Sequence, residues 1–315
     1  MVETQALKSV FTSSLKLKAE ESCLIVTDTI KESIGRDFYN YAASITPFSK
    51  IIVIEPTKEH SSEPPEEVAK EMLKFGVQLL ITAKSLTHTK ARREASAKGR
   101  RIATMPDVTE DICNRCLGID YAKLKNESMR LYTILGETKK VRVTTDLGTD
   151  MIFEIGDSGF FGKDGGCFDY PGAYGNLPEG EVSFAPGNCQ GSYIVDASFP
   201  DIGILDTPLT FKVRDGLVYE ISGGRSQEII ARLDKAGSRA WKVAELGIGL
   251  NPKAKISGNI LEDEKVIGTV HIALGNNLSY GGTNDVPLHL DGVILKPDIF
   301  LDDRKIMQSG KFSIL

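Results

Sequence analysis

Continuously apolar runs alternate with helical patterns through the first half of the chain. The runs SCLIVTD, KIIVIEP, VQLLITAK and RRIATMP are short and rich in branched residues. Between them lie segments such as PPEEVAKEMLKFG, which begins with Pro and Glu and ends with Gly, the usual polarity of a helix. Strands without polar alternation, separated by helices, indicate a buried and mainly parallel sheet. We therefore predict a doubly wound α/β domain over residues 1–135.

The pattern changes near residue 136, after DYAKLKNESMRLYTILGET, which is typical of a connecting helix. In KKVRVTTDLGTDMIFEI, apolar and polar residues alternate on both sides of a Leu-Gly turn, which predicts a hairpin. Further short strands are expected at EVSFAP, GSYIVDASF, LTFKVRDGLVYEI, GTVHIAL and VPLHLDGVIL, and one helix at SQEIIARLDKAGSRAWKVAEL. Residues 136–315 are therefore expected to form a β-rich α+β domain.

The composition argues against two classes of partner. The 315 residues carry a formal net charge of -5, so no global field favours nucleic acid or an anionic membrane surface. No stretch approaches the roughly 20 apolar residues of a membrane span, and the N-terminus lacks the apolar core of a signal peptide. We therefore expect a cytoplasmic protein.

Three familiar motifs are missing or incomplete. No G-x-G-x-x-G or G-x-x-x-x-G-K-[ST] follows a predicted strand, so the α/β domain is expected to be Rossmann-like without a phosphate loop. The pair in CNRC, residues 113–116, has no second pair to complete a zinc site and lies inside a predicted helix, which indicates packing thiols. The basic run KARREASAKGRR is more typical of a solvated helix face than of a phosphate site.

His289 and Asp291 stand out because they interrupt the apolar run VPLHLDGVIL. Residues i and i+2 of a strand point to the same face, so the imidazole and the carboxylate project together. This arrangement suits a shared metal ion, but it equally suits a simple His-Asp hydrogen bond or two solvated residues. The pair alone leaves these alternatives open.

Three further residues strengthen the metal hypothesis. His271 lies in the predicted strand GTVHIALG, Glu181 begins the strand after a Pro-Glu-Gly turn, and Glu245 lies at the end of the predicted helix. Together the five residues offer three carboxylates, two imidazoles and no thiolate, a set that suits Zn²⁺, Mn²⁺, Co²⁺ or Fe²⁺. One catalytic zinc needs only three protein ligands, so five suggest two metal ions and hydrolytic chemistry.

The motifs LPEGEV, AELGIGLNP, GTVHIALG, GG-N and HLDGV resemble, in this order, the motifs of the M29 metallopeptidases, the aminopeptidase T and S group. SLTHTKARREASAKGRRIATMP also resembles the N-terminal domain of that family, so the similarity covers nearly the whole chain. The resemblance implies a dimeric aminopeptidase with two metal ions, Zn, Co or Mn. Glu181, Glu245, His271, His289 and Asp291 match the family's metal ligands, with Glu181 and Glu245 also catalytic. Tyr280 is the candidate for the family's tyrosine, as a ligand or an oxyanion donor.

The aminopeptidase hypothesis predicts that a metal-bound hydroxide attacks the first peptide bond of a peptide substrate. A related branch uses the same scaffold as an iron-dependent dioxygenase that opens dihydroxypyridine rings, and this is the alternative. Retention of both Glu181 and Glu245 favours the hydrolase. A hydrolase acting on another small molecule, or a metal-binding protein without turnover, are further alternatives. His88, between a strand end and a helix start, either contacts substrate or caps the turn.

Overall fold

The computed structural model describes residues 1–314, except for the side chain of residue 158, and the chain folds as two compact units. Unit 1 comprises Met1–Lys125 and Asp164–Glu179, and unit 2 comprises Asn126–Lys163 and the residues from Gly180 onward. The boundary expected at residue 135 falls within helix α6 (Tyr121–Gly136). The segment 164–179 belongs to unit 1 because its strand β7 (Tyr174–Asn176) pairs in parallel with β4 (Arg101–Thr104).

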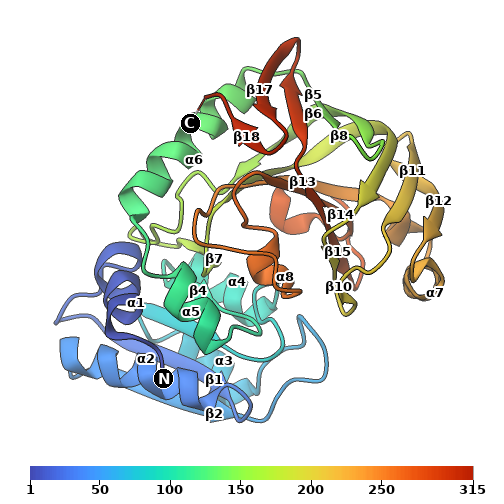
Figure 1. The fold of residues 1–315 in the computed structure, drawn as a ribbon. Coiled ribbons are helices and arrows are strands. Elements are labelled where there is room, and N and C mark those ends of the chain that lie inside the picture. The colour runs from blue at the N-terminus through green and yellow to red at the C-terminus, as the bar shows by residue number, and fades with distance from the viewer. Residues whose placement is uncertain (315) are drawn as a thin grey trace. The chain divides into compact units, whose positions relative to one another are not determined.

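Unit 1 is the predicted α/β domain, built on a five-stranded parallel sheet in the order β2-β1-β3-β4-β7 (Figure 1). The other three strands are β1 (Cys23–Asp28), β2 (Ser49–Ile54) and β3 (Val77–Ile81). The helices are α1 (Thr4–Ser9), continued by a π-helical turn (Val10–Ser14), then α2 (Glu32–Ile45), α3 (Glu66–Met72), α4 (Lys90–Ala97) and α5 (Glu110–Cys116). Apolar residues of β1, β3 and β4 pack with those of α3 and α4 in one core, as the uninterrupted apolar strands require.

The basic run of residues 90–101 is not simply a solvated face, so that prediction is wrong for two of its arginines. Arg92 is 3% exposed, its Nε donates to the carbonyl oxygen of Thr87 at 2.6 Å, and its guanidinium lies 3.8 Å from the centroid of the Tyr174 ring. Arg101 donates to both carboxylate oxygens of Glu21 at 2.9 Å. These cations stabilise unit 1 from within, which periodicity alone does not reveal.

All five cysteines are buried and free, including the pair in α5. Burial raises the pKa of the Cys113 thiol, which disfavours the thiolate needed for redox chemistry or metal binding. The structure therefore agrees with the interpretation of this pair as packing thiols.

Unit 2 contains a large antiparallel sheet, whose main path runs β15-β14-β13-β8-β6-β5-β16-β17-β18 (Figure 1). The hairpin of β11 (Leu209–Arg214) and β12 (Leu217–Gly223) pairs through β11 with β8. The path strands are β5 (Lys140–Thr144), β6 (Asp150–Phe161), β8 (Glu181–Val195), β13 (Val243–Gly249), β14 (Thr269–Gly275), β15 (His289–Leu295), β16 (Asp298–Leu301), β17 (Arg304–Gln308) and β18 (Lys311–Phe312). A two-stranded sheet, β9 (Ser198–Phe199) with β10 (Gly203–Ile204), completes the predicted β-rich fold.

Two predicted elements of unit 2 differ from the structure. EVSFAP and GSYIV form one long strand, β8, rather than two. The predicted helix over residues 226–246 ends at Ala236 of α7 (Ser226–Ala236), because Gly237 adopts a left-handed φ of 95° and a 3-10 turn (Ser238–Trp241) follows. Glu245 therefore lies in β13, not at a helix end. All seven residues of β13 are buried, and such a run cannot be told from a buried helix by periodicity.

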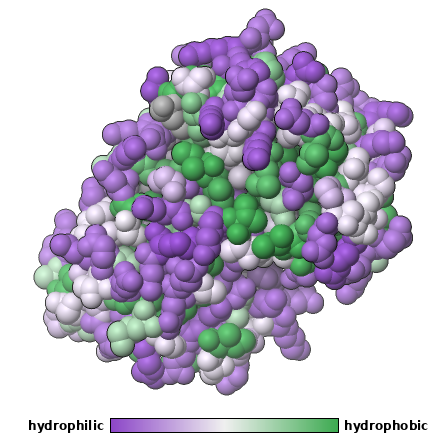
Figure 2. Space-filling model, in the orientation of Figure 1, coloured by the Kyte–Doolittle hydropathy of each residue, from purple (hydrophilic) through white to green (hydrophobic). Residues whose placement is uncertain are grey.

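Hydrophilic residues make up most of the visible surface, and hydrophobic residues form smaller groups among them (Figure 2). Exposed apolar side chains include Ile204, Ile267 and Leu278, and such residues are ordinary on folded proteins. Among residues 1–314, no helix is both long and apolar enough to cross a membrane. The cytoplasmic location and the homodimer stay predictions.

Candidate metal centre

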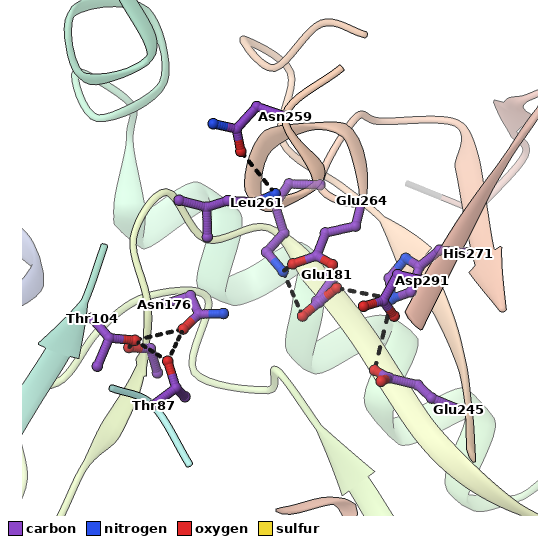
Figure 3. A network of polar contacts seen from close by, with 12 residues as sticks. Thr87, Thr104, Asn176, Glu181, Glu245, Asn259, Leu261, Glu264, His271 and Asp291 are labelled. Atoms are coloured by element: carbon purple, nitrogen blue, oxygen red, sulfur yellow. Dashed lines mark hydrogen bonds and ion pairs between the residues drawn. The ribbon is translucent and has the colours of Figure 1, made fainter. Parts of the chain in front are cut away.

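Four neighbouring strands of unit 2 bring the five predicted ligands together. Figure 3 shows four of them, Glu181, Glu245, His271 and Asp291. Glu181 is the first residue of β8, Glu245 lies in β13, His271 in β14, and His289 and Asp291 in β15. The strands are adjacent in the order β15-β14-β13-β8, so residues distant in sequence become cross-strand neighbours.

Each of these side chains has a small residue opposite it on the next strand. The register pairs Glu181 with Gly249, Glu245 and Asp291 with Ala273 from either side, His271 with Gly247, and His289 with Gly275. At Gly247 a Cβ atom would lie 2.1 Å from Nε2 of the His271 ring, closer than any real contact. The glycines of AELGIG thus leave the space that the imidazole fills.

A hydrogen bond to the backbone of Asn276 orients the His289 ring. Its Nδ1 lies 2.7 Å from the carbonyl oxygen of Asn276, which can only accept, so Nδ1 carries the proton and donates. Nε2 then faces Glu245 Oε2 at 3.0 Å and Asp291 Oδ1 at 3.2 Å. Burial would lower the pKa of His289, but Asp291 and Glu245 raise it well above its ordinary value. The short distances from Nε2 to two carboxylate oxygens are therefore favourable only if Nε2 carries a proton or if a metal ion lies between these atoms.

His271 and the two glutamates form a second contact of the same kind. Nε2 of His271 lies 3.2 Å from Glu181 Oε2 and 3.7 Å from Glu245 Oε1. Burial opposes the charged imidazole, but Glu245 and Glu181 raise the pKa of His271 to about 9. Burial also opposes ionisation of Glu245, yet the two imidazoles hold its pKa below the ordinary value. The arrangement concentrates negative charge where solvent is nearly excluded.

Several buried polar atoms of the cluster have no hydrogen-bond partner among the described residues. They are Nδ1 of His271 and two carboxylate oxygens, Glu181 Oε2 and Glu245 Oε2, which face imidazole nitrogens at 3.2 and 3.0 Å. Buried carboxylate oxygens normally accept hydrogen bonds or bind cations. Unpartnered oxygens beside imidazole nitrogens fit a divalent metal, and the mixed oxygen and nitrogen donors suit a first-row transition ion.

Within the part of the chain that the structure describes, three overlapping sets of donors lie close enough to hold an ion, with all donor atoms of a set within 4.8 Å of one another. They are Glu181, Glu245 and His271; Glu245, His289 and Asp291; and Glu264, His271 and Asp291. The five predicted ligands therefore all belong to possible metal sets, and Glu264 is an addition. Whether each of the five binds metal stays a prediction.

Glu264 and its neighbour Lys265 are the residues that the sequence patterns did not reveal. The side chain of Lys265 is 0% exposed, and its Nζ lies 2.7 Å from Glu181 Oε1 and also contacts Glu264 Oε1. Burial raises the pKa of Glu264 to about 8. The segment LEDEK is typical of a solvated helix end, so nothing in its pattern indicates a buried ion pair.

Tyr280 lies beside the cluster in the turn Leu278–Tyr280. Its ring stacks on His289 with centroids 5.4 Å apart, and the edge-to-face partner on its other side is Phe161, also at 5.4 Å. Burial and the nearby carboxylates raise the pKa of the Tyr280 hydroxyl well above its ordinary value, so the phenol stays neutral. The contact that the structure shows is ring packing against His289, and the predicted roles as ligand or oxyanion donor stay predictions.

His88 belongs to unit 1, between β3 and α4. The helix is capped by its neighbour Thr89, whose hydroxyl accepts from the backbone N–H of Arg92 at 3.2 Å. The carbonyl oxygen of His88 accepts a hydrogen bond from Arg93. The predicted capping role thus falls to Thr89, and contact of His88 with substrate stays a prediction.

The family model and the curated relative that match this chain carry the same description. Residues 16–314 match the family model NicX, described as 2,5-dihydroxypyridine 5,6-dioxygenase. A 2,5-dihydroxypyridine 5,6-dioxygenase of Pseudomonas putida KT2440 is 22% identical over 248 residues, which cover 74% of this chain and 70% of that protein.

Two solved structures share the fold. The 2,5-dihydroxypyridine dioxygenase from Pseudomonas putida KT2440 is similar with a TM-score of 0.84 and 17% identity, covering 99% of this chain and 97% of that one. Wild-type AmpT from Thermus thermophilus is similar with a TM-score of 0.68 and 14% identity, covering 98% of each chain. The fold predicted from the sequence is confirmed by both.

The identification as an M29 metallopeptidase is wrong, and with it the aminopeptidase, protease and hydrolase assignments. The ordered motifs mark strands and turns of a fold that also occurs in AmpT, so they do not specify the reaction. Retention of Glu181 and Glu245 was also a misleading criterion, since both occur in a chain that matches the dioxygenase model over almost its whole length. The chain belongs to the 2,5-dihydroxypyridine 5,6-dioxygenase family.

Proposed function

We propose that this protein is an iron-dependent dioxygenase that opens the ring of a dihydroxylated pyridine. The observation that carries the proposal is the family match over residues 16–314. The chemistry of the cluster supports it, because imidazole and carboxylate donors without thiolate suit ferrous iron.

His271, His289 and Asp291 are the residues that we propose to hold the iron. Two histidines and one carboxylate are the donor set of many non-haem iron oxygenases. Asp291 belongs to one metal set with His289 and to another with His271, so it links the two imidazoles. Glu245, which faces both rings, is a further candidate ligand. Ferrous iron bound there would supply the redox chemistry that joins dioxygen to an aromatic substrate.

The protein's own residues fix the geometry of these donors. The Asn276 carbonyl sets the tautomer of His289, and the Tyr280 ring packs against its face. Gly247 gives the His271 ring its space. His271 and Glu245 are each 1% exposed, so bulk water has little access to these donors, and their electrostatic interactions are strong.

The proposal is tested with protein reconstituted anaerobically with Fe²⁺, mixed with 2,5-dihydroxypyridine and followed with an oxygen electrode. We expect oxygen uptake together with loss of the ring absorbance of the substrate. Zn²⁺-loaded protein is the control and should consume no oxygen. Release of leucine from Leu-peptides by the Zn²⁺, Co²⁺ or Mn²⁺ forms, without oxygen uptake by the iron form, would overturn the proposal.

A further inference from the structure

Lys265 places a positive charge inside the carboxylate cluster. Its side chain is fully buried, and its Nζ contacts both Glu181 Oε1 and Glu264 Oε1. A buried ammonium is costly unless it is paired closely, so this cation belongs to a tightly built arrangement. No step of the proposed reaction uses it.

The backbone holds Lys265 in place. It follows the one-turn helix α8 (Ile260–Asp263), which Asn259 caps by accepting from the N–H of Leu261 at 3.1 Å. The N–H of Lys265 donates to the carbonyl oxygen of Glu262 at 2.9 Å, and its own carbonyl oxygen accepts from Asn251 at 2.8 Å. Because Asn251 follows β13 directly after Leu250, the lysine is tied to the strand that carries Glu245.

Lys265 contacts residues of two of the three donor sets and none of the third. Glu181 belongs to one set and Glu264 to another, and the ammonium binds a carboxylate oxygen of each. The set of Glu245, His289 and Asp291 contains neither of these residues. The iron proposed to be held by His271, His289 and Asp291, with Glu245 as a further candidate, uses neither of these carboxylates, whereas a second ion at either other set would share a carboxylate with the ammonium.

We propose that the Lys265 ammonium takes the place of a second metal cation and limits the centre to one divalent ion per chain. Two cations on one carboxylate in a poorly solvated site repel each other strongly, and the ammonium is covalently held, so the free ion is the one excluded. Without Lys265, Glu181 and Glu264 would be left unpaired and would attract a second ion. The inference rests on the proposed function only in assuming that the centre binds metal.

Wild-type protein gives the first test. After loading with excess Mn²⁺ and removal of free metal, elemental analysis should find about one ion per chain. The electron paramagnetic resonance spectrum should be that of isolated Mn²⁺. Two ions per chain with a spin-coupled spectrum would overturn the inference, and this measurement requires no variant.

The second test is Lys265→Ala, with Lys242→Ala as its control, because Lys242 precedes β13 outside the carboxylate cluster. We expect Lys265→Ala to bind about two Mn²⁺ per chain with a spin-coupled spectrum, and Lys242→Ala to bind about one. If Lys265→Ala does not fold, Lys265→Met, which keeps the aliphatic packing, is measured in its place. A neutral variant that folds and still binds a single ion contradicts the inference.

The two proposals fail separately. A wild-type chain that binds one isolated Mn²⁺ but, with Fe²⁺, consumes no oxygen supports the role of Lys265 and overturns the dioxygenase. A chain that consumes oxygen yet binds two coupled ions retains the proposed function and loses this inference.

Discussion

Unit 1 and unit 2 each contain a partly buried polar cluster, and the two clusters differ in whether protein groups alone satisfy their polar atoms. In unit 1 the Thr87 and Thr104 hydroxyls lie 2.7 Å apart, and Thr104 donates to Asn176 Oδ1 at 2.6 Å, so neutral groups satisfy one another (Figure 3). In unit 2 the carboxylates and imidazoles leave buried oxygens without hydrogen-bond partners. A neutral network can be closed by the protein alone, whereas an excess of buried carboxylates needs a cation.

The largest effect is expected from removing an imidazole of unit 2. His289→Ala takes away the nitrogen that faces Glu245 and Asp291, and since even outer partners of a metal site change affinity 10–100-fold, iron affinity should fall by at least about 100-fold. Iron content and oxygen uptake should fall together. Thr104→Val, which breaks the neutral cluster of unit 1, should cost about 1 kcal/mol of unfolding free energy and leave the iron content unchanged. Wild-type iron content in His289→Ala would place the ion elsewhere.

A smaller loss is expected when the space around the metal centre is filled. In Gly247→Ala the new methyl group meets the His271 ring at 2.1 Å, so the imidazole must move. We expect iron affinity to fall about 10–100-fold, with destabilisation of about 1–3 kcal/mol, measured by metal titration and thermal unfolding. Gly136→Ala is the matched control, because no atom lies within 4 Å of the added Cβ. Unchanged affinity in Gly247→Ala would show that His271 is not a ligand.

The charged cluster should also make the metal-free protein sensitive to pH. The pKa of His271 is raised from 6.5 to about 9, and that of His289 is raised well above its ordinary value, in both cases by the neighbouring carboxylates and against the effect of burial. The folded chain therefore keeps protons that the unfolded chain has lost, and stability must fall as the pH rises from about 6.5 to 9. Metal competes with these protons, so the increase in Tm on adding Mn²⁺ should grow over the same range. A Tm of the metal-free protein that rises with pH would contradict these protonation states.

Unit 1 could be predicted from the sequence because its apolar strands are punctuated by Pro and Gly, and each forms where it was expected. The strand β7 was missed, since its three residues YGN carry no apolar pattern. In unit 2 His271, His289 and Asp291 could be singled out as candidate ligands because such residues are rare in apolar strands, whereas Glu245 was singled out at an expected helix end that the structure replaces by β13. Lys265 and Glu264 could not be singled out, because they follow a one-turn helix whose burial depends on tertiary contacts such as the backbone hydrogen bond between Asn251 and Lys265. The reaction class also could not be predicted, since the fold occurs both in a dihydroxypyridine dioxygenase and in AmpT.

The smallest effect is expected at Tyr280, where two variants distinguish ring packing from metal binding. If its contribution is to pack against His289, Tyr280→Phe keeps the stacked ring and should leave iron affinity within about two-fold of wild type. Tyr280→Ala removes the ring and should weaken binding by about two- to ten-fold, the equivalent of one aromatic contact. Metal titration of both variants decides the matter. A loss in Tyr280→Phe as large as that in His289→Ala would make the hydroxyl a ligand, and the cation of unit 2 would then be held by a neutral phenol as well as by the charged cluster.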